Sequence, residues 1–181
     1  MTPDDLLTLP MTELKQRYPS MKRALFSAFH IGGCQSCAYG EDETLASVCE
    51  RNELAPAAVA AEILESAERD AAMMLSPQEA QSLLQSAEPP LLLDTRTREE
   101  YEAVKITGAV LLTQEFQNSL FKPENEQRTI LLYDHTGLNA LDTCSWFHGH
   151  GLKGTRIIAG GIDRWAQEVE ENMPRYRVEL D

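Results

Sequence analysis

The sequence predicts an α/β protein in which a parallel sheet flanked by helices is preceded by a small all-α domain. Up to about residue 72, apolar residues recur at helical spacing. Beyond that point, four short apolar segments alternate with helical stretches, which is the pattern of a parallel sheet with helices on its faces. These segments are residues 91–95, 109–112, 129–134 and 155–159. We therefore expect two domains, residues 1–72 and 73–181.

The N-terminal domain is predicted to hold helices at residues 11–17, 19–30, 41–52 and 56–74. Tyr18 and Pro19 separate the first two, because proline disfavours the helical conformation in the residue before it. Pro56 suits the first turn of the last helix. A capping-box pattern at residues 76–79 then starts a new helix, so the domain boundary is placed near residues 72–76.

The chain is acidic, with 16 Lys and Arg residues against 29 Asp and Glu residues and a formal net charge of −13. This balance argues against nucleic acid and anionic membranes as partners, because both would repel the protein. The first residues lack a basic segment followed by an apolar one, and no later run approaches the ~20 apolar residues of a membrane span. We therefore expect a cytoplasmic protein with neither a nucleic-acid nor a membrane partner.

A buried strand that runs into a tight loop and then a helix is predicted around Asp134. The loop comprises Asp134, His135, Thr136, Gly137, Leu138 and Asn139. Backbone N–H groups in such a loop form a cradle for an anion at its start. A cysteine thiolate there would be a nucleophile. Asp134 instead fills the cradle with a fixed negative charge that cannot accept and pass on a sulfur atom.

Two further features support this part of the prediction. Asp94 ends the first strand, and Arg96 follows it closely enough to form a buried or half-buried ion pair. We interpret this pair as structural support for the neighbouring loops. Gly160 and Gly161 supply a sharp turn between the last strand and the last helix, where a side chain would obstruct the backbone.

These segments, together with Gly108-Ala109 and Trp165, resemble the rhodanese-like (sulfurtransferase) domain family over roughly residues 76–175. The resemblance implies a rhodanese-like parallel sheet flanked by helices. Active members of the family carry a cysteine at the position of Asp134, and often an arginine at that of Asn139, whereas Gly137 is retained here. The resemblance therefore implies a domain without sulfurtransferase activity.

Cys34 and Cys37 form a Cys-x-x-Cys pair in a glycine-bearing turn. This arrangement suits a reversible disulfide, because the second thiol can resolve an adduct on the first. The same spacing also serves zinc and iron–sulfur sites. A homodimer in which each chain gives both cysteines would supply the four thiolates of such a site. We expect no cofactor, with zinc or an iron–sulfur cluster as one alternative and a structural pair as another.

The segment from Tyr18-Pro19 through Cys34 and Cys37 to the following helix resembles the hybrid-cluster-protein-associated redox disulfide domain over about residues 8–66. The resemblance implies a redox or sulfur-handling role for Cys34 and Cys37. Cys49 and Cys144 are interpreted as thiols packed in the core. His148 and His150 are interpreted as a solvated cap at a helix end.

The leading hypothesis is a sulfur- or redox-related protein that acts through Cys34 and Cys37 and whose partner is a protein of a sulfur or redox pathway. One alternative is a non-catalytic module for partner binding or regulation. Another is a sulfurtransferase in which Cys34 or Cys37 is delivered to the loop at Asp134 in place of the absent cysteine.

Overall fold

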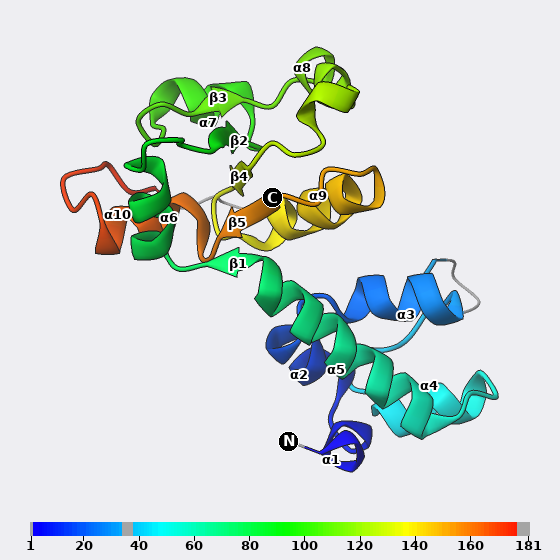
Figure 1. The fold of residues 1–181 in the computed structure, drawn as a ribbon. Coiled ribbons are helices and arrows are strands. Elements are labelled where there is room, and N and C mark those ends of the chain that lie inside the picture. Colours follow the sequence, from blue (N-terminus) through cyan, green and yellow to red (C-terminus); the bar gives the residue numbers. More distant parts are fainter. Residues whose placement is uncertain (1, 34–37, 177–181) are drawn as a thin grey trace. The chain divides into compact units, whose positions relative to one another are not determined.

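The computed structural model describes residues 2–33 and 38–176, which form two compact units, Met1–Ala72 and Met73–Asp181. Figure 1 shows the helices of the first unit and the sheet of the second. No helix of the described ranges is long and apolar enough to cross a membrane. Cys34 and Cys37 lie outside the described residues.

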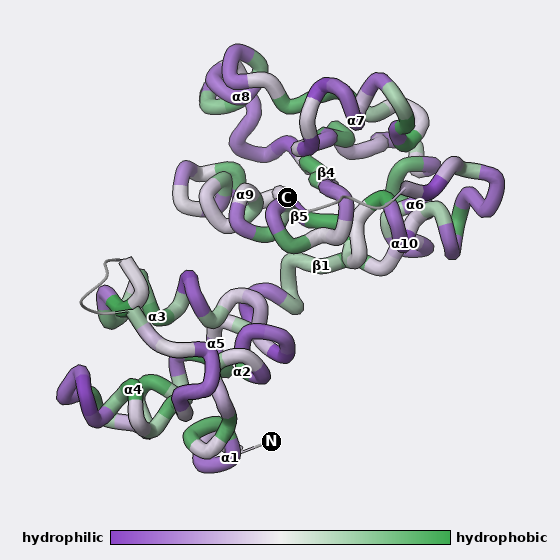
Figure 2. The backbone as a smooth tube through the Cα atoms, turned by 180° about the vertical axis from the view of Figure 1, so that it is seen from behind, coloured by the Kyte–Doolittle hydropathy of each residue, from purple (hydrophilic) through white to green (hydrophobic). Residues whose placement is uncertain are grey.

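The first unit is built from helices (Figure 1). They are α1 (Pro3–Leu7), α2 (Met11–Arg17), α3 (Met21–Phe29), α4 (Leu45–Arg51) and α5 (Pro56–Met73), the last of which ends at the boundary between the units. Their apolar side chains share one core, in which Leu14, Leu25, Leu45 and Ile63 are each fully buried. Figure 2 shows how hydrophobic and hydrophilic residues alternate along these helices, as helices packed on one side require.

The helix predicted at residues 41–52 is shorter than expected. It begins at Leu45 because the Thr44 hydroxyl accepts a hydrogen bond from the backbone N–H of Ser47 at 3.3 Å and caps the helix. The acidic residues before it lie in a turn, where the Glu43 carboxylate accepts the N–H of Gly40 at 2.6 Å. The side chain of Glu43 thus stabilises the approach to the helix rather than its first turn.

The second unit contains a five-stranded sheet in the order β1-β5-β4-β2-β3, and every neighbouring pair is parallel. The strands are β1 (Met74–Leu75), β2 (Leu91–Asp94), β3 (Val110–Leu111), β4 (Ile130–Tyr133) and β5 (Thr155–Ile158). The helices are α6 (Pro77–Leu84), α7 (Arg98–Ala103), α8 (Gln114–Leu120), α9 (Leu138–Gly149) and α10 (Gly161–Glu168), with a 3-10 turn, η2, at Pro123–Asn125. The predicted fold class is confirmed.

Alternate residues of the central strands point to opposite faces of the sheet and bury two separate cores. Ile130 and Leu132 of β4 pack with α8 and α9 on one face. Leu131 and Tyr133 pack with α6 and α10 on the other. Because β4 is covered on both sides, all four of its residues are buried, which explains its continuous apolar sequence.

The edge strand β1 was not predicted. Met74 pairs with Ile157, and Leu75 with Ile158, where the sequence predicted the end of a long helix. Two residues carry no periodic pattern, so only the pairing with a strand about eighty residues further along the chain defines them as a strand.

Candidate functional site

The loop that follows β4 closes around the carboxylate of Asp134. One carboxylate oxygen accepts the backbone N–H of Gly137 in a short hydrogen bond. The other accepts the N–H of Asn139 at 2.7 Å and that of Ala140 at 3.1 Å. The side chain is buried, with the residue only 3% exposed. The predicted cradle therefore exists, and its donors at the start of α9 are directed at a charge that belongs to the chain itself.

Two glycines bring this loop against the start of α10. Gly137 has φ +90°, and a Cβ on it would lie 2.9 Å from the nitrogen of Gly160. Gly161 has φ +58°, and a Cβ there would lie 2.4 Å from the carbonyl oxygen of Asp134. The N–H of Ile162 donates to that same carbonyl oxygen at 2.9 Å. Neither position tolerates a side chain, so the close approach of the loop to the start of α10 requires glycine at both.

The predicted ion pair of Asp94 and Arg96 is present at the carboxyl end of β2. The Arg96 guanidinium donates to both Asp94 oxygens, with Nε to Oδ1 at 2.9 Å and Nη2 to Oδ2 at 2.5 Å. Both side chains are almost fully buried. Nη2 also donates to the carbonyl oxygen of Val104 at 2.6 Å, so the pair ties β2 to the end of α7. Their predicted role, structural support for the neighbouring loops, stays a prediction.

Tyr176 joins this ion pair to the loop, and sequence reasoning missed it. Its hydroxyl accepts from Nη1 of Arg96 at 2.5 Å and donates to the Glu100 carboxylate at 2.6 Å. Its ring lies against the ring of His135, with centroids 4.7 Å apart. The segment after α10 thus returns to the carboxyl edge of the sheet and covers part of the loop.

The network changes the proton affinities of its members. Burial lowers the pKa of Arg96, but the hydrogen bonds and charge of Asp94 outweigh it and raise that pKa above its usual value. Burial and the hydrogen bond to Glu100 raise the pKa of Tyr176 to about 12. Burial opposes ionisation of Glu100, yet the hydrogen bonds from Tyr176 and Thr97 lower its pKa overall. At neutral pH Arg96 and Glu100 are therefore charged and Tyr176 is a neutral bridge between them.

Cys144 lies on α9 in the core, fully buried. Its sulfur is 3.6 Å from the sulfur of Met73 and 3.5 Å from the carbonyl oxygen of Thr155. His148, predicted as a solvated cap, instead donates through Nε2 to that same carbonyl oxygen at 2.9 Å. Cys49 is also buried, and burial raises the pKa of its thiol, which keeps it protonated. Both thiols are buried, so neither cysteine has the exposed setting of a reactive thiol.

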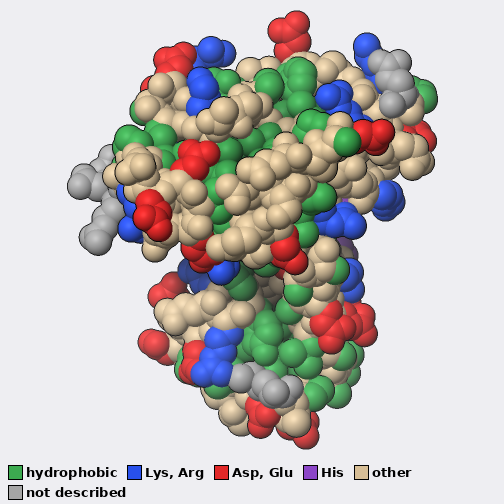
Figure 3. Space-filling view, turned by 60° about the vertical axis from the view of Figure 1, so that its left-hand side comes forward, with side chains coloured by type: hydrophobic (Ala, Val, Ile, Leu, Met, Phe, Trp, Pro, Cys, Tyr) green, Lys and Arg blue, Asp and Glu red, His purple; other side chains and the backbone are tan. Residues whose placement is uncertain are grey.

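Within the described ranges, no group of three or more His, Cys, Asp or Glu residues is placed to hold a metal ion. The residues predicted for redox or persulfide chemistry, Cys34 and Cys37, fall outside those ranges. Figure 3 shows acidic and basic side chains mingled over one face of the molecule, so on that face the excess of negative charge is not gathered into one patch.

A family profile matches the part of the chain that contains β2 to β5, the loop after β4 and the glycine turn before α10. The profile of the rhodanese-like domain matches residues 76–168, just over half of the chain. The chain belongs to the rhodanese-like domain family. All six residues of the loop around Asp134 and both members of the Asp94–Arg96 pair lie within the matched region.

Curated relatives of this rhodanese-like protein join two activities in their names. The probable adenylyltransferase/sulfurtransferase MoeZ of Mycobacterium tuberculosis is 30% identical over 105 residues, which cover 56% of this chain and 26% of the relative. The adenylyltransferase and sulfurtransferase UBA4 of Candida albicans is 22% identical over 110 residues, which cover 56% of this chain and 25% of the relative. The chain thus spans about a quarter of the length of these relatives.

Solved structures also resemble the chain. The human single-domain sulfurtransferase TSTD1 is 24% identical, with a TM-score of 0.47, over 53% of this chain and 96% of that one. A Rhodopseudomonas palustris protein of unknown function is 20% identical, with a TM-score of 0.48, over 59% of this chain and 88% of that one.

Proposed function

We propose that this protein handles sulfur or redox equivalents through the dithiol of Cys34 and Cys37, and that its rhodanese-like domain lacks sulfurtransferase activity. The observation that carries the proposal is the carboxylate of Asp134, which accepts three backbone N–H groups of its own loop. Those donors would otherwise be free to stabilise a sulfur anion. A carboxylate cannot accept a sulfane sulfur, so the loop serves structure and recognition.

The reaction assigned to the dithiol needs only thiol chemistry. One thiolate, of Cys34 or Cys37, attacks the outer sulfur of a low-molecular-weight persulfide. A sulfur–sulfur bond forms on the protein while that of the donor breaks, and the donor leaves as a thiolate. The second thiolate then attacks the inner, protein-bound sulfur, which forms the internal disulfide and releases hydrosulfide. An external dithiol supplies the two electrons that restore both thiols.

The rhodanese-like domain would then recognise a protein partner of the same sulfur or redox pathway. Two apolar side chains of α9 support a recognition role, since Leu138 is 50% exposed and Trp146 is 42% exposed. Exposed aromatic side chains are common at protein interfaces. This observation also supports a second candidate function, a non-catalytic partner-binding module in which neither unit performs chemistry.

The test is peptide mapping by mass spectrometry after anaerobic purification and treatment with a persulfide donor. We expect added sulfur on Cys34 or Cys37 that a reductant removes, and none in the Cys34→Ser/Cys37→Ser variant. An unmodified, metal-free chain would contradict the proposal and favour the binding module. If the intact protein retains the mass of zinc or of an iron–sulfur cluster, Cys34 and Cys37 would be assigned to metal binding instead. Thiosulfate-to-cyanide turnover by the intact chain would restore the sulfurtransferase alternative.

A further inference from the structure

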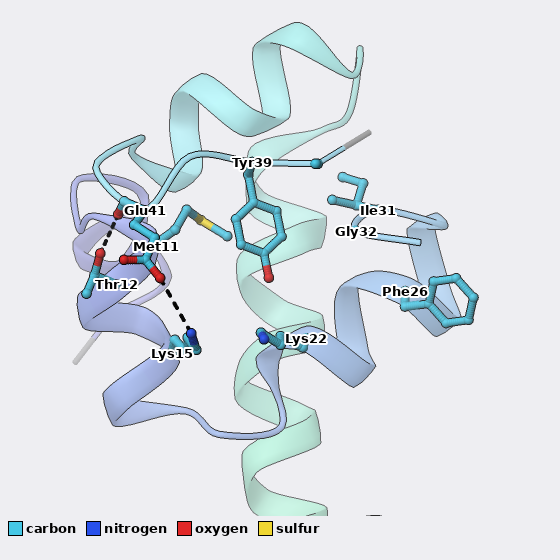
Figure 4. A pocket seen from close by; sticks show the side chains of 10 residues that line it. Met11, Thr12, Lys15, Lys22, Phe26, Ile31, Gly32, Tyr39 and Glu41 are labelled. Atoms are coloured by element: carbon cyan, nitrogen blue, oxygen red, sulfur yellow. Dashed lines mark hydrogen bonds and ion pairs between the residues drawn. The ribbon is translucent and has the colours of Figure 1, made fainter. Parts of the chain in front are cut away.

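A cavity of about 290 Å³ opens in the first unit between α2, α3 and the connection from α3 to α4. Figure 4 shows its walls. Its volume lies at the lower limit of small-molecule sites, roughly 300 Å³, so it suits a compact metabolite. It is lined by Met11, Thr12, Lys15, Lys22, Phe26, Ile31, Gly32, Ala38, Tyr39 and Glu41.

The cavity carries positive charge that is only partly balanced. Lys15 forms an ion pair with Glu41 at 3.6 Å, between two exposed side chains. Lys22 forms no ion pair or hydrogen bond with any residue that the structure describes. In a chain with a net charge of −13, a lysine left without a carboxylate partner at the wall of a cavity is a binding group for an anion.

Tyr39 adds a hydrogen-bond donor beside this cation. Figure 4 shows its side chain pointing into the space bounded by Lys15 and Lys22. Its hydroxyl makes no hydrogen bond to a residue of the described ranges. Burial raises the pKa of Tyr39, so the phenol keeps its proton at neutral pH and can donate to a carboxylate.

The remaining wall is apolar. Met11 and Ile31 are buried at 1% and 2% exposure, whereas Phe26 is 55% exposed. The ring of Phe26 lies directly on the chain at Gly33, where a Cβ would be 2.4 Å from Cε2. This wall can contact the carbon skeleton of a ligand whose carboxylate is bound by Lys22 and Tyr39.

The position of the cavity in the chain connects it to thiol chemistry. Gly32 and Ala38 both line it. In the sequence they stand two residues before Cys34 and one residue after Cys37. A ligand in the cavity would therefore contact residues that flank the Cys-x-x-Cys segment in the sequence.

We propose that this cavity binds a low-molecular-weight thiol compound that bears a carboxylate, as its thiol, persulfide or disulfide, with Lys22 and Tyr39 on the carboxylate. The carboxylate assignment stands on the cavity alone. The thiol assignment rests on the proposed function of Cys34 and Cys37.

Binding without chemistry is measured first, by calorimetric titration of glutathione into full-length Cys34→Ser/Cys37→Ser protein. We expect S-methylglutathione to bind as glutathione does, and glutathione diethyl ester to bind about fivefold more weakly. Adding Lys22→Gln should weaken glutathione binding by a similar factor. The control is Lys153→Gln, at an exposed lysine of the second unit, which should leave glutathione binding unchanged. Equal binding of the ester, or no binding of glutathione, overturns the assignment.

Reactivity then tests the thiol class in the native chain. A thiolate of Cys34 or Cys37 attacks one sulfur of glutathione disulfide, which forms a mixed disulfide and expels one glutathione thiolate. Lys22→Gln should slow this reaction about fivefold and leave the rate with the uncharged disulfide of 2-hydroxyethanethiol unchanged. If both rates fall together, or neither falls, the cavity does not direct the ligand.

The two measurements separate the cavity from the proposed function. If glutathione binds but neither cysteine takes up sulfur from a persulfide donor, the proposed function fails and the carboxylate site stands. If an uncharged donor loads Cys34 or Cys37 but glutathione does not bind, the site fails and the proposed function stands.

Discussion

The loop at Asp134 and the cavity at Lys22 each contain a charged side chain, and they differ in whether the fold supplies partners for that charge. Asp134 is 3% exposed, and its carboxylate accepts three N–H groups of the loop that it begins. Lys22 is exposed at the wall of a cavity and has no charged partner among the described residues. The first charge is satisfied by the fold, and the second is available to a ligand.

Loss of the buried ion pair should give the largest effect on stability. Arg96→Met leaves Asp94 buried and unpaired, and it also removes the donors to Val104 and Tyr176. We expect the free energy of unfolding to fall by about 3–5 kcal/mol, as measured by urea denaturation. Arg98→Met, which breaks an exposed contact with Glu102 at 3.9 Å, is the control, with an expected loss of about 0.5 kcal/mol or less. Equal losses would show that the Asp94–Arg96 pair does not support the loop.

Removal of the carboxylate in the loop should come next. Asp134→Ala leaves three N–H groups without their acceptor in a buried setting. We expect a loss of about 2–3 kcal/mol in the free energy of unfolding. Glu115→Ala, at an exposed position of α8, should change it by about 0.5 kcal/mol at most. An Asp134→Ala variant with an unchanged free energy of unfolding would mean that the fold does not satisfy the charge of Asp134. The contrast with Lys22 would then be lost.

Tyr176→Phe should cost about 1–2 kcal/mol, because its hydroxyl bridges Arg96 and Glu100. The pKa of Tyr176 is raised to about 12 in the folded state. A raised pKa contributes stability that is complete below the unfolded value of about 10 and disappears as pH rises through the folded value. The wild type should therefore lose its advantage over Tyr176→Phe between about pH 10 and about pH 12. Parallel pH profiles of unfolding for the two proteins would contradict the bridge.

The stability of the protein at low pH tests the same network independently. The pKa of Glu100 is lowered in the folded state. A lowered pKa contributes stability above the unfolded value of about 4.3, and this is lost as pH falls through the folded value. We expect Glu100→Gln to be less stable than wild type by about 1 kcal/mol at neutral pH and equal to it at strongly acid pH. A difference that persists in acid would assign the loss to something other than the charge of Glu100.

The smallest effect on stability is expected at Lys22. Lys22→Gln should change the free energy of unfolding by about 0.5 kcal/mol or less, because the lysine is exposed and unpaired among the described residues. The same substitution should weaken glutathione binding about fivefold. Asp134 would then govern stability and Lys22 would govern ligand binding. A destabilised Lys22→Gln protein would show that this lysine, like Asp134, is used by the fold.

Local features were predictable from the sequence, and contacts across long stretches of chain were not. Asp94 and Arg96 are two residues apart, so their ion pair follows from the turn that separates them. The strand, loop and helix around Asp134 are continuous in sequence. Tyr176 meets Arg96 across 80 positions of the chain, and no local pattern marks that contact. The cavity at Lys22 likewise arises from the packing of two helices and a connection, and no motif encodes it.

The central claim is that sulfur chemistry belongs to Cys34 and Cys37, while the loop at Asp134 is filled by its own carboxylate. Its most direct test is the sulfur taken up per chain from a persulfide donor by three folded proteins: wild type, Asp134→Asn and Cys34→Ser/Cys37→Ser. We predict full uptake by wild type and Asp134→Asn, and none by the cysteine variant. Normal uptake by the cysteine variant, or loss of uptake in Asp134→Asn, would contradict the account.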